Sequence, residues 1–345
     1  MKAEPTRLLL SGAQGLLARS IAWHWLASSP DAAVVGFGRS ARLSDTYSHH
    51  LDLDGRQVPA RLPAGLLGID GHPRYVYVPC SLDDAAGLDD LISRARPHVV
   101  IHSAAALRDD DTAALVQANV SGTASLVESC LRERWADRFV LVSSGAVLGR
   151  PVIDHPLAAV LDGPADPYAI SKRAGEQIAA ALALRGGMPL AVARVFNLIG
   201  PGLQSRHLPA EVAARLEAVR RGAAPLLQLG DLSTQRDLVS VDDAARAVVA
   251  VAQQQESPDQ PWGGLVDIGS GTATVMRDLV TLMIETAGLT GRIELREEGR
   301  RPFDAPTIVA DTAALAALGA RPTTPLAQTC AELQAYVADQ WDSTG

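Results

Sequence analysis

The chain has 345 residues, a mass of 36.2 kDa, 47% hydrophobic residues and a formal net charge of −8. This length can hold one large domain or two lobes around a sizeable core. The acidic balance argues against nucleic acid or an anionic membrane as a partner. No apolar run is long enough to cross a bilayer, and the run at residues 8–10 is too short for a secretion signal. We therefore expect a cytoplasmic protein.

The cysteines Cys80, Cys130 and Cys330 are odd in number and far apart in the sequence. This usage is typical of reduced thiols in a cytosolic protein, and the spacing matches no zinc motif. We expect neither a disulfide framework nor a metal site.

In the first half of the chain, short apolar runs alternate with segments of helical periodicity. Strands that alternate with helices predict a parallel sheet covered on both faces, and the valine, isoleucine and leucine content of the runs fits full burial. Residues 39–73 are rich in glycine, proline and aspartate and match neither pattern. The predicted strands are residues 7–11, 33–38, 74–79, 98–103, 138–143 and 190–196, and the predicted helices are residues 16–27, 84–94, 112–135 and 167–184.

After Asn197 the alternation changes, and a Gly-Pro-Gly turn precedes mostly helical sequence. We predict an α/β fold with a Rossmann-type doubly wound parallel sheet, residues 1–196 and 237–268, and a smaller, mostly helical lobe, residues 197–236 and 269–345. A cleft between two lobes is a usual place for a ligand. The elements predicted in this half are helices at residues 209–221 and 242–254 and strands at residues 226–229, 238–241, 265–268 and 292–296.

The first predicted strand runs into the sequence Gly12-Ala13-Gln14-Gly15-Leu16-Leu17-Ala18. Glycines at a strand–helix junction let the backbone approach a pyrophosphate, and the helix N-terminus adds free N–H groups and a partial positive charge. The spacing Gly-x-x-Gly-x-x-Ala at this junction favours a dinucleotide site over an ordinary glycine turn. The residues expected to contact the dinucleotide here are Gly12, Gln14, Gly15, Leu16 and Leu17.

The end of the second predicted strand indicates which dinucleotide binds. An acidic residue there would bind the adenosine ribose hydroxyls of NAD. The sequence has Gly38 at this position, followed by Arg39 and Ser40, and an arginine suits a 2′-phosphate through paired charged hydrogen bonds. We therefore predict NADP(H) as the preferred cofactor. NAD(H) stays open as an alternative, in which Arg39 only stacks on the adenine.

Lys172 is the sole lysine apart from Lys2, since the other cationic side chains are arginines. An ammonium is a compact charge that fits close to a phenol or a ribose, whereas a guanidinium is a planar fork. Tyr168 precedes Lys172 by four residues, so a helix would bring both side chains to one face. A neighbouring cation lowers the pKa of a tyrosine toward neutrality. The pair predicts an acid–base site, the alternative being a surface pair on an amphipathic helix.

Two further strand ends complete an ordered set of motifs. His102-Ser103-Ala104-Ala105 ends the fourth predicted strand, and Ser143-Ser144 ends the fifth. The order of glycine turn, His-x-Ala-Ala, Ser-Ser and Tyr-x-x-x-Lys resembles the extended short-chain dehydrogenase/reductase family along essentially the whole chain. The resemblance implies a Rossmann lobe that binds a nicotinamide cofactor and a catalytic triad of Ser144, Tyr168 and Lys172. The cofactor contacts that it implies beyond the glycine turn are Ser81, Leu82, Ser103, Ala104, Ala105, Tyr168 and Lys172.

Three later segments, residues 194–202, 235–243 and 300–304, resemble the sugar-nucleotide enzymes of this family. They imply a substrate with a pyrophosphate whose charge two guanidinium groups neutralise. For Arg236, the alternative is an ion pair with an aspartate of its own segment that only caps a helix. The residues implied to bind the nucleotide sugar are Ser144, Tyr168, Asn197, Arg236 and Arg301.

Dehydratases of this family carry an acidic pair just after the catalytic serine or threonine, whereas this chain has Gly145 and Ala146 there. Leu148 and Leu198 also replace a tyrosine and a histidine that are common in the family. We therefore expect NADPH-dependent reduction of a nucleotide-linked 4-keto or 4-keto-6-deoxy sugar, with GDP as the favoured nucleotide and Tyr168 as the proton donor. The alternatives are a nucleotide-sugar 4-epimerase with a bound NAD(P) and a non-catalytic NADP-binding sensor or scaffold.

The resemblance also implies a homodimer. In this family two helices of each subunit form the interface, and here they are residues 112–135 and 167–184, both rich in alanine, leucine and valine. The alternative is that these apolar faces only cover the sheet.

Overall fold

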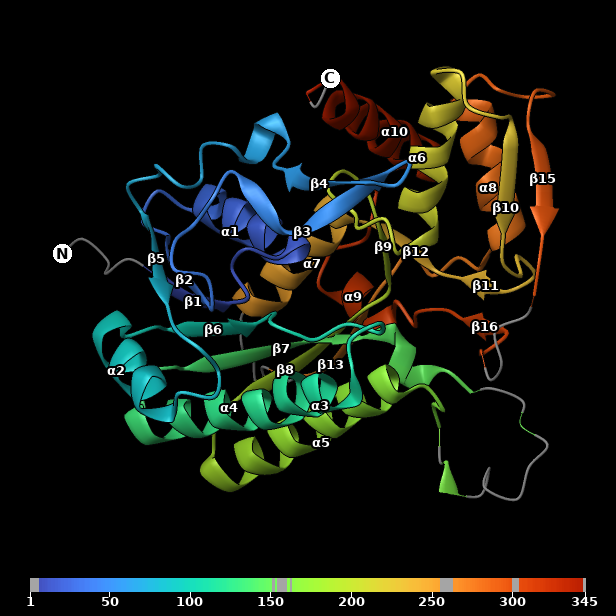
Figure 1. The fold of residues 1–345 in the computed structure, drawn as a ribbon. Coiled ribbons are helices and arrows are strands. Elements are labelled where there is room, and N and C mark those ends of the chain that lie inside the picture. Colours follow the sequence, from blue (N-terminus) through green and yellow to red (C-terminus); the bar gives the residue numbers. More distant parts are fainter. Residues whose placement is uncertain are drawn as a thin grey trace.

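A parallel sheet of seven strands forms the centre of the part of the chain that the computed structural model describes, which is residues 6–150, 153, 160–161, 163–254, 263–299 and 304–343 (Figure 1). The strand order is β13-β8-β7-β6-β1-β2-β5, and every neighbouring pair is parallel. From β1 the chain builds the sheet outward in both directions, as in a doubly wound Rossmann fold, so the predicted fold class is confirmed. The strands are β1 (Arg7–Ser11), β2 (Ala33–Gly38), β5 (Tyr75–Pro79), β6 (Val99–His102), β7 (Arg138–Ser144), β8 (Leu190–Val195) and β13 (Gly264–Ile268).

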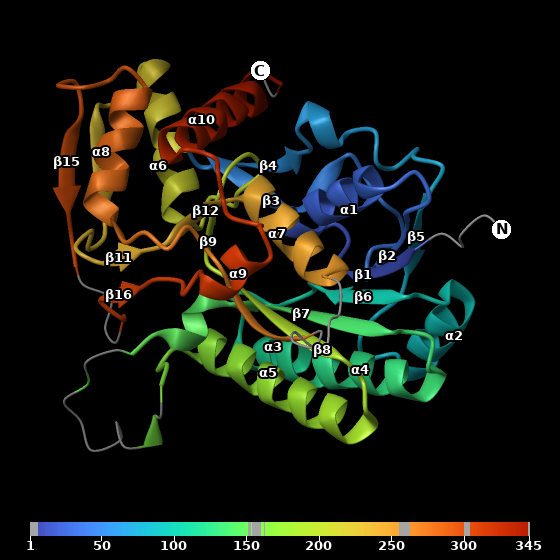
Figure 2. The same ribbon diagram turned by 180° about the vertical axis from the view of Figure 1, so that it is seen from behind.

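Helices cover both faces of this sheet (Figure 2). Successive side chains of a strand point to opposite faces, and in β1 the fully buried Leu8 and Leu10 join one apolar cluster while Leu9 joins another. The first face is covered by α1 (Leu16–Ser28), α7 (Val241–Gln253) and α9 (Ala313–Ala317), and the second by α2 (Ala85–Ala95), α4 (Gly122–Glu133) and α5 (Pro167–Gly186). Burial on both faces explains why the strands are apolar along their whole length.

The helix predicted at residues 112–135 is interrupted near its start. α3 (Thr112–Val116) is followed by a π-helical turn, Gln117–Ser121, before α4 begins. A π turn replaces i→i+4 by i→i+5 bonding and frequently marks a functional position. Here the turn carries the buried side chain of Asn119.

Residues 39–73, which match no pattern in the sequence, contain a β-hairpin. β3 (Thr46–Leu53) and β4 (Arg56–Arg61) pair antiparallel around Asp54-Gly55, whose φ angles are 57° and 80°. Asp-Gly between alternating apolar residues is a strong hairpin signal, because both turn residues need positive φ. The inward side chains of the hairpin join the apolar cluster beneath the C-terminal helices.

This third apolar cluster lies beyond the carboxyl side of the large sheet, in the upper part of Figure 1. Its helices are α6 (Leu208–Arg220), α8 (Met276–Thr286) and α10 (Leu326–Asp342). Short strands connect them: β9 (Asn197–Ile199) with β12 (Leu238–Ser240), β10 (Leu226–Leu229) with β15 (Glu294–Glu297), and β11 (Gln235–Arg236) with β14 (Thr274–Val275) and β16 (Thr307–Ile308). Strands of two or three residues have no periodicity, so the sequence predicted few of them.

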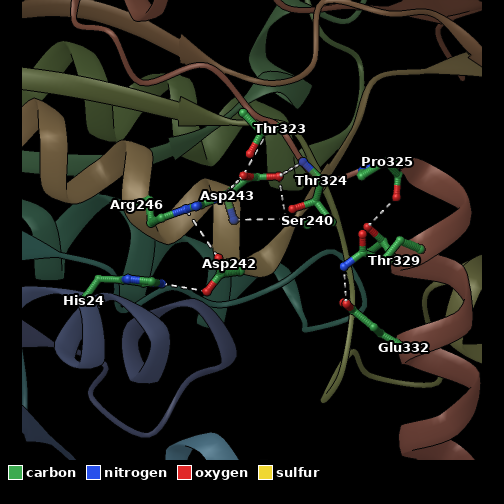
Figure 3. Close-up of polar contacts among 11 residues, drawn as sticks. His24, Ser240, Asp242, Asp243, Arg246, Thr323, Thr324, Pro325, Thr329 and Glu332 are labelled. Atoms are coloured by element: carbon green, nitrogen blue, oxygen red, sulfur yellow. Dashed lines mark hydrogen bonds and ion pairs between the residues drawn. The ribbon is translucent and has the colours of Figure 1, made fainter. Parts of the chain in front are cut away.

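Asp243 ties the N-terminus of α7 to the chain before α10 (Figure 3). Its buried carboxylate accepts hydrogen bonds from the Ser240 hydroxyl at 2.9 Å and from the N–H groups of Thr323 at 3.2 Å and Thr324 at 2.9 Å, and it pairs with Arg246. Burial by itself raises the pKa of Asp243, but the hydrogen bonds from Thr324 hold the pKa below its ordinary value. The acidic end of the 235–243 segment therefore stabilises the fold.

Candidate active site

The turn between β1 and α1 has the backbone geometry of a dinucleotide cradle. Gly12 has a φ of 67°, and a Cβ placed on it would lie 2.8 Å from the backbone of Ala104. Gly15 is the N-cap of α1, and no side chain caps this helix, so its first N–H groups can bind an anion. Leu16 is half-buried beside the turn, whereas Leu17 packs in the core and can offer a ligand only its backbone. These residues fit the pyrophosphate of a dinucleotide.

The end of β6 lies against the same cradle. Ser11 Oγ accepts the backbone N–H groups of Ser103 and Ala104, each at 3.0 Å. Since both lone pairs of Ser11 Oγ are then used, its hydroxyl donates to His102 Nδ1 at 2.7 Å. Ser103 and Ala104 are half-buried and Ala105 is exposed, so this segment of small residues borders the cradle.

This hydrogen bond determines the tautomer of His102. Because Nδ1 accepts, the Nε2–H donates to Thr123 Oγ1 at 3.0 Å, and the Thr123 hydroxyl donates to the Asn119 carbonyl at 2.8 Å. Burial, together with the nearby Lys172 ammonium, lowers the pKa of His102 to about 3. A neutral histidine therefore links the cradle to the π turn through a chain of directed hydrogen bonds.

Asn119 connects the π turn to the helix that carries the candidate tyrosine. Its side chain accepts the Ala106 N–H at 3.0 Å and donates to the Ala106 carbonyl at 3.1 Å and to Ser171 Oγ at 2.9 Å. A Cβ on Gly175 would collide with the Asn119 carbonyl, so α5 packs directly on the π turn. Asn119 escaped prediction, because one asparagine in a segment of helical periodicity does not indicate a π turn.

Ser144, Tyr168 and Lys172 come together at the carboxyl end of β7. Tyr168 lies in the first turn of α5, and its phenol is close enough to the Ser144 hydroxyl for this contact by itself to lower the Tyr168 pKa. Ser144 Oγ also accepts the N–H of Ala146 at 3.2 Å. Lys172, one turn further along α5, is only 7% exposed and donates from Nζ to the Val142 carbonyl at 2.8 Å. The site thus groups a phenol, a hydroxyl and an ammonium, a set suited to proton transfer with a substrate oxygen.

Burial has the largest effect on the pKa values of Tyr168 and Lys172. It lowers the pKa of Lys172 to about 8, although Glu176 opposes the shift. It raises the pKa of Tyr168, while the Ser144 hydrogen bond and the Arg108 charge act in the opposite direction. The expectation that Lys172 brings the Tyr168 pKa toward neutrality is therefore wrong, because desolvation of the phenolate outweighs the neighbouring cations and the ammonium is directed at a carbonyl.

Arg39 and Ser40 lie just beyond the end of β2, in the loop beside the β1–α1 turn. Both are exposed, and the Ser40 carbonyl accepts the Tyr77 hydroxyl at 3.0 Å. Gln14 Nε2 donates to the Arg42 carbonyl at 2.7 Å, which holds this loop beside the cradle. Among the described residues, no side chain pairs with the Arg39 guanidinium, so it can bind a ligand without first breaking an ion pair.

Ser81 and Leu82 follow β5 beside the same strand ends. The Cys80 N–H donates to the Gly38 carbonyl at 3.0 Å, which extends the pairing of β5 with β2 up to these residues. Both side chains are half-buried, and a Cβ on Gly122 would approach Leu82 to 3.0 Å. Leu82 therefore packs under α4 and lies next to the ends of β2 and β5.

The structure describes four of the five residues expected to bind the nucleotide sugar, and Ser144 and Tyr168 are placed above. Asn197 is exposed at the start of β9 and donates from Nδ2 to the Asp237 carbonyl at 3.0 Å. Arg236 has 12% of its side chain exposed and pairs with Asp304 at 2.7 Å. The fully buried Asp237 carboxylate accepts hydrogen bonds from the segment after β13. Arg301 lies outside the described residues.

Arg108 is a second cation near Tyr168 that sequence reasoning missed. Its guanidinium pairs with Asp166 at 2.8 Å, and Asp166 is also the N-cap of α5, accepting the Ala169 N–H at 3.1 Å. The positive charge of Arg108 lowers the Tyr168 pKa. Residues 108 and 166 are distant in the sequence, and the packing of α5 on the segment after β6 brings them together.

The acidic run at residues 109–111 borders the same site. Arg206, from the loop before α6, lies 3.7 Å from Asp109 and 3.9 Å from Asp110. The charge of Arg206 also acts on Tyr168. The loop after β6 and the loop before α6 therefore meet beside the candidate tyrosine, rather than pointing separately into solvent.

Known proteins are similar to this chain in sequence. The model of the NAD dependent epimerase/dehydratase family matches residues 8–269, and the chain belongs to this family. The chain is 30% identical over 201 residues to the GDP-6-deoxy-D-mannose reductase of Pseudomonas aeruginosa, an alignment that spans 55% of this chain and 64% of that enzyme. It is 27% identical over 352 residues to the dTDP-L-rhamnose 4-epimerase of Burkholderia thailandensis, spanning 90% of this chain and 94% of the epimerase.

Solved structures share its fold. The UDP-glucuronic acid 4-epimerase from Bacillus cereus, in complex with UDP-glucuronic acid and NAD, superposes with a TM-score of 0.76 at 20% identity, covering 96% of this chain and 99% of the epimerase. RMD from Pseudomonas aeruginosa, complexed with NADPH, superposes with a TM-score of 0.71 at 21% identity, covering 97% and 99%.

The chain is therefore an NAD(P)-dependent oxidoreductase of the extended short-chain type, within a family of nucleotide-sugar reductases, epimerases and dehydratases. Across the described ranges, no group of three or more histidine, cysteine, aspartate or glutamate side chains could hold a metal ion. Within the same ranges no helix is long and apolar enough to span a membrane.

Proposed function

We propose that the protein uses NADPH to reduce a nucleotide-linked 4-keto sugar, with a GDP-linked 4-keto-6-deoxy sugar favoured, as a GDP-4-keto-6-deoxy-D-mannose reductase does. The observation that carries this proposal is the Tyr168 phenol beside the Ser144 hydroxyl, with no acidic residue at the two positions that follow this serine. A dehydratase needs that extra pair to remove water, and Gly145 and Ala146 occupy its position. A Cβ on Gly145 would lie 2.7 Å from the Phe196 ring, so a larger side chain does not fit there.

Two side chains, Tyr168 and Ser144, act on the substrate oxygen, and a third, Lys172, faces the cofactor. When bound, NADPH supplies the hydride. Tyr168 donates its proton to the substrate oxygen, and the raised pKa keeps the phenol protonated at neutral pH until that oxygen becomes basic. The Ser144 hydroxyl hydrogen-bonds the same oxygen and orients it. The Lys172 ammonium, held by the Val142 carbonyl, would hold the nicotinamide ribose, while the charges of Arg108 and Arg206 favour the phenolate that the transfer leaves behind.

The cradle holds the cofactor at two ends. Gly12 and Gly15 let the backbone approach the pyrophosphate at the N-terminus of α1, where N–H groups are available. Arg39 and Ser40 would hold the 2′-phosphate of NADP(H), which the exposed and unpaired guanidinium supports. A relative of the same fold is complexed with NADPH, and another holds NAD.

On the substrate side, we assign the nucleotide pyrophosphate to Arg236 and Arg301, with Asn197 at the sugar end. Arg236 is oriented by its ion pair with Asp304 and by the hydrogen bond that its Nη1 donates to the Gln235 carbonyl at 2.7 Å, and its positive charge supports a place beside an anionic group. The position of Asn197 in β9, directly after β8, supports its placement near the carboxyl ends of the sheet strands.

A 4-epimerase is the second candidate. It is favoured by the dTDP-L-rhamnose 4-epimerase, which aligns with 90% of this chain, and by the fold shared with a UDP-glucuronic acid 4-epimerase. An epimerase would use the same phenol in both directions and consume no cofactor.

The two candidates differ in what they consume. We would incubate the purified protein with NADPH and GDP-, UDP- or dTDP-linked 4-keto-6-deoxy sugars and follow absorbance at the nicotinamide wavelength. Consumption of NADPH equal to the sugar reduced, abolished in Tyr168→Phe, supports the reductase. Interconversion of UDP- or dTDP-hexoses without added NADPH, seen by NMR, supports the epimerase instead. NADPH that is stable with every keto sugar would overturn the reductase proposal.

A further inference from the structure

The β3–β4 hairpin contacts both proposed binding regions at once (Figure 1). On the cofactor side, the Ser48 N–H donates to the Gln14 carbonyl of the cradle at 3.3 Å. On the opposite side, the Asp52 N–H donates to Ser205 Oγ at 2.8 Å, in the loop that leads to Arg206. The last carbonyl of β4 is fixed from behind by a 2.8 Å hydrogen bond from α10.

The hairpin also packs against the Gly-Pro-Gly turn. Gly202 has a φ of 88°, and a Cβ on it would collide with the Tyr47 ring and lie 2.9 Å from the Leu16 side chain. Leu16 begins α1, so the cradle, the hairpin and this turn meet at one point. The Gly202 carbonyl accepts a hydrogen bond from His49 Nε2 at 2.8 Å.

His49 is held in place for this hydrogen bond. Its ring stacks on Tyr47 with 5.4 Å between centroids and 11° between planes. A carbonyl can only accept, so the ring donates through Nε2–H. Burial lowers the pKa of His49 to about 4 against the opposing effect of the Gly202 bond, so the ring is neutral at neutral pH.

We propose that the hairpin is a positioning element for the reaction, in which His49 holds the Gly-Pro-Gly turn against the cofactor cradle. The turn separates Asn197 from Arg206, and Arg206 already reaches the acidic residues beside Tyr168. This inference rests on the proposed function, because it takes residues 200–207 as a wall of the substrate site. It predicts that a dinucleotide bound in the cradle also orders this loop and so favours nucleotide-sugar binding.

Hydrogen exchange measured by mass spectrometry tests the coupling without a substrate. The full-length wild type, His49→Ala, His49→Gln and His50→Ala are compared with and without saturating NADP⁺, or NAD⁺ if the wild type binds it more tightly. We expect the dinucleotide to slow exchange of residues 200–207 about tenfold in the wild type. His50→Ala, which alters the exposed neighbour, should behave like the wild type.

The two His49 variants separate the hydrogen bond from general packing. His49→Ala should lose most of the slowing, whereas His49→Gln keeps an N–H donor near the position of Nε2 and should restore it. In turnover assays, His49→Ala should raise the KM for the nucleotide sugar about 5- to 10-fold, with kcat and the KM for NADPH within about twofold of the wild type. Thermal unfolding verifies that each variant is folded.

Equal slowing in the wild type and His49→Ala would overturn the proposal, as would a wild-type loop that does not respond to the dinucleotide. Failure of the proposed function has a different signature. In that case no variant turns over any nucleotide sugar, while the exchange of residues 200–207 still depends on the side chain at position 49.

Discussion

Lys172 is one of only two lysines in the chain, and its ammonium is buried against the Val142 carbonyl. A guanidinium is larger and planar, so Lys172→Arg cannot occupy this space unchanged. We expect Lys172→Arg to lower kcat about 10²-fold or more with normal folding, and Tyr168→Phe to lower it roughly 10²- to 10⁴-fold with NADPH binding retained. Steady-state kinetics and fluorescence titration with NADPH measure these effects. Near-wild-type turnover in Lys172→Arg would show that the isolated lysine is an accident of composition.

Arg39 should discriminate between the two dinucleotides. Its exposed guanidinium has no partner among the described side chains, so removing it leaves no buried group unpaired. We expect Arg39→Ala to weaken NADPH binding by about 1.5–3 kcal/mol, the value of a charged hydrogen bond or a pair of them, and to leave NADH nearly unchanged. Calorimetric titration of both dinucleotides measures this. Equal losses would indicate that Arg39 stacks on the adenine instead.

The lowered pKa of His102 makes the free energy of unfolding depend on pH. Its folded-state pKa of about 3 lies below the ordinary 6.5, so between these values the unfolded chain binds one more proton than the native state. The contribution of His102 to the free energy of unfolding is therefore fully present above about pH 6.5. It is lost as the pH falls toward 3, at about 1.4 kcal/mol per pH unit.

The variant His102→Gln removes this titration while keeping side-chain amide groups for hydrogen bonding. We expect it to be less stable than the wild type at pH 7. Between pH 6 and pH 4 its free energy of unfolding should fall less steeply than that of the wild type, by about 1.4 kcal/mol per pH unit. Urea unfolding across this pH range gives both values. Parallel pH profiles of the two proteins would contradict the assignment of a neutral His102.

At the scale of elements, the packing of α5 on the π turn sets where Tyr168 and Lys172 lie. A Cβ on Gly175 would collide with the Asn119 backbone, which cannot move without shifting the turn. We expect Gly175→Ala to destabilise the protein by about 1–3 kcal/mol and to lower kcat as well. Urea unfolding and steady-state kinetics measure the two effects.

Gly186, at the end of the same helix, is the matched control. A Cβ there would meet only the side chain of Leu131, which can change rotamer. We expect Gly186→Ala to be neutral or to stabilise α5 by up to about 1 kcal/mol through helix propensity, with activity unchanged. If both glycine variants behaved alike, the π turn would not be what requires Gly175.

The sequence contains a signal for the β3–β4 hairpin, but it does not indicate where the hairpin packs in the fold. Asp54-Gly55 between alternating apolar residues predicts a hairpin by its need for positive φ, although residues 39–73 as a whole match no pattern. Its docking on α6 and α10 depends on apolar residues more than a hundred positions away. We propose that it belongs with the smaller lobe of residues 197–236 and 269–345, since its inward side chains are buried in that cluster.

At the scale of the whole molecule, we propose a homodimer formed through α3–α5. Val116 is 48% exposed, Ile170 42% and Leu184 84%, so this layer presents apolar side chains that the sheet does not cover. Sedimentation velocity at micromolar concentration should give about twice the 36.2 kDa chain mass. We expect Leu184→Glu to shift the mass toward one chain, and Val76→Glu, at the exposed edge of the sheet, to leave it unchanged. A wild-type mass near one chain would rule the dimer out.

Much of the molecule followed from the sequence alone. The strands of the large sheet were predicted nearly to their ends, because a parallel strand buried on both faces must be apolar along its length. The glycine turn, the Ser-Ser strand end and the Tyr-x-x-x-Lys spacing marked Ser144, Tyr168 and Lys172, which the structure brings together. These signals are local: each depends on residues within one turn or one strand end.

Only the tertiary structure determined the surroundings of those residues. The pairing of Arg108 with Asp166, the approach of Arg206 to residues 109–111 and the directed bonds from Ser11 through His102 all join segments far apart in the chain. The direction of the Tyr168 pKa shift was likewise mispredicted, because it depends on how deeply packing buries the phenol rather than on the lysine four residues away. Spacing along the sequence specifies which groups can meet, whereas desolvation and charge are properties of the folded environment.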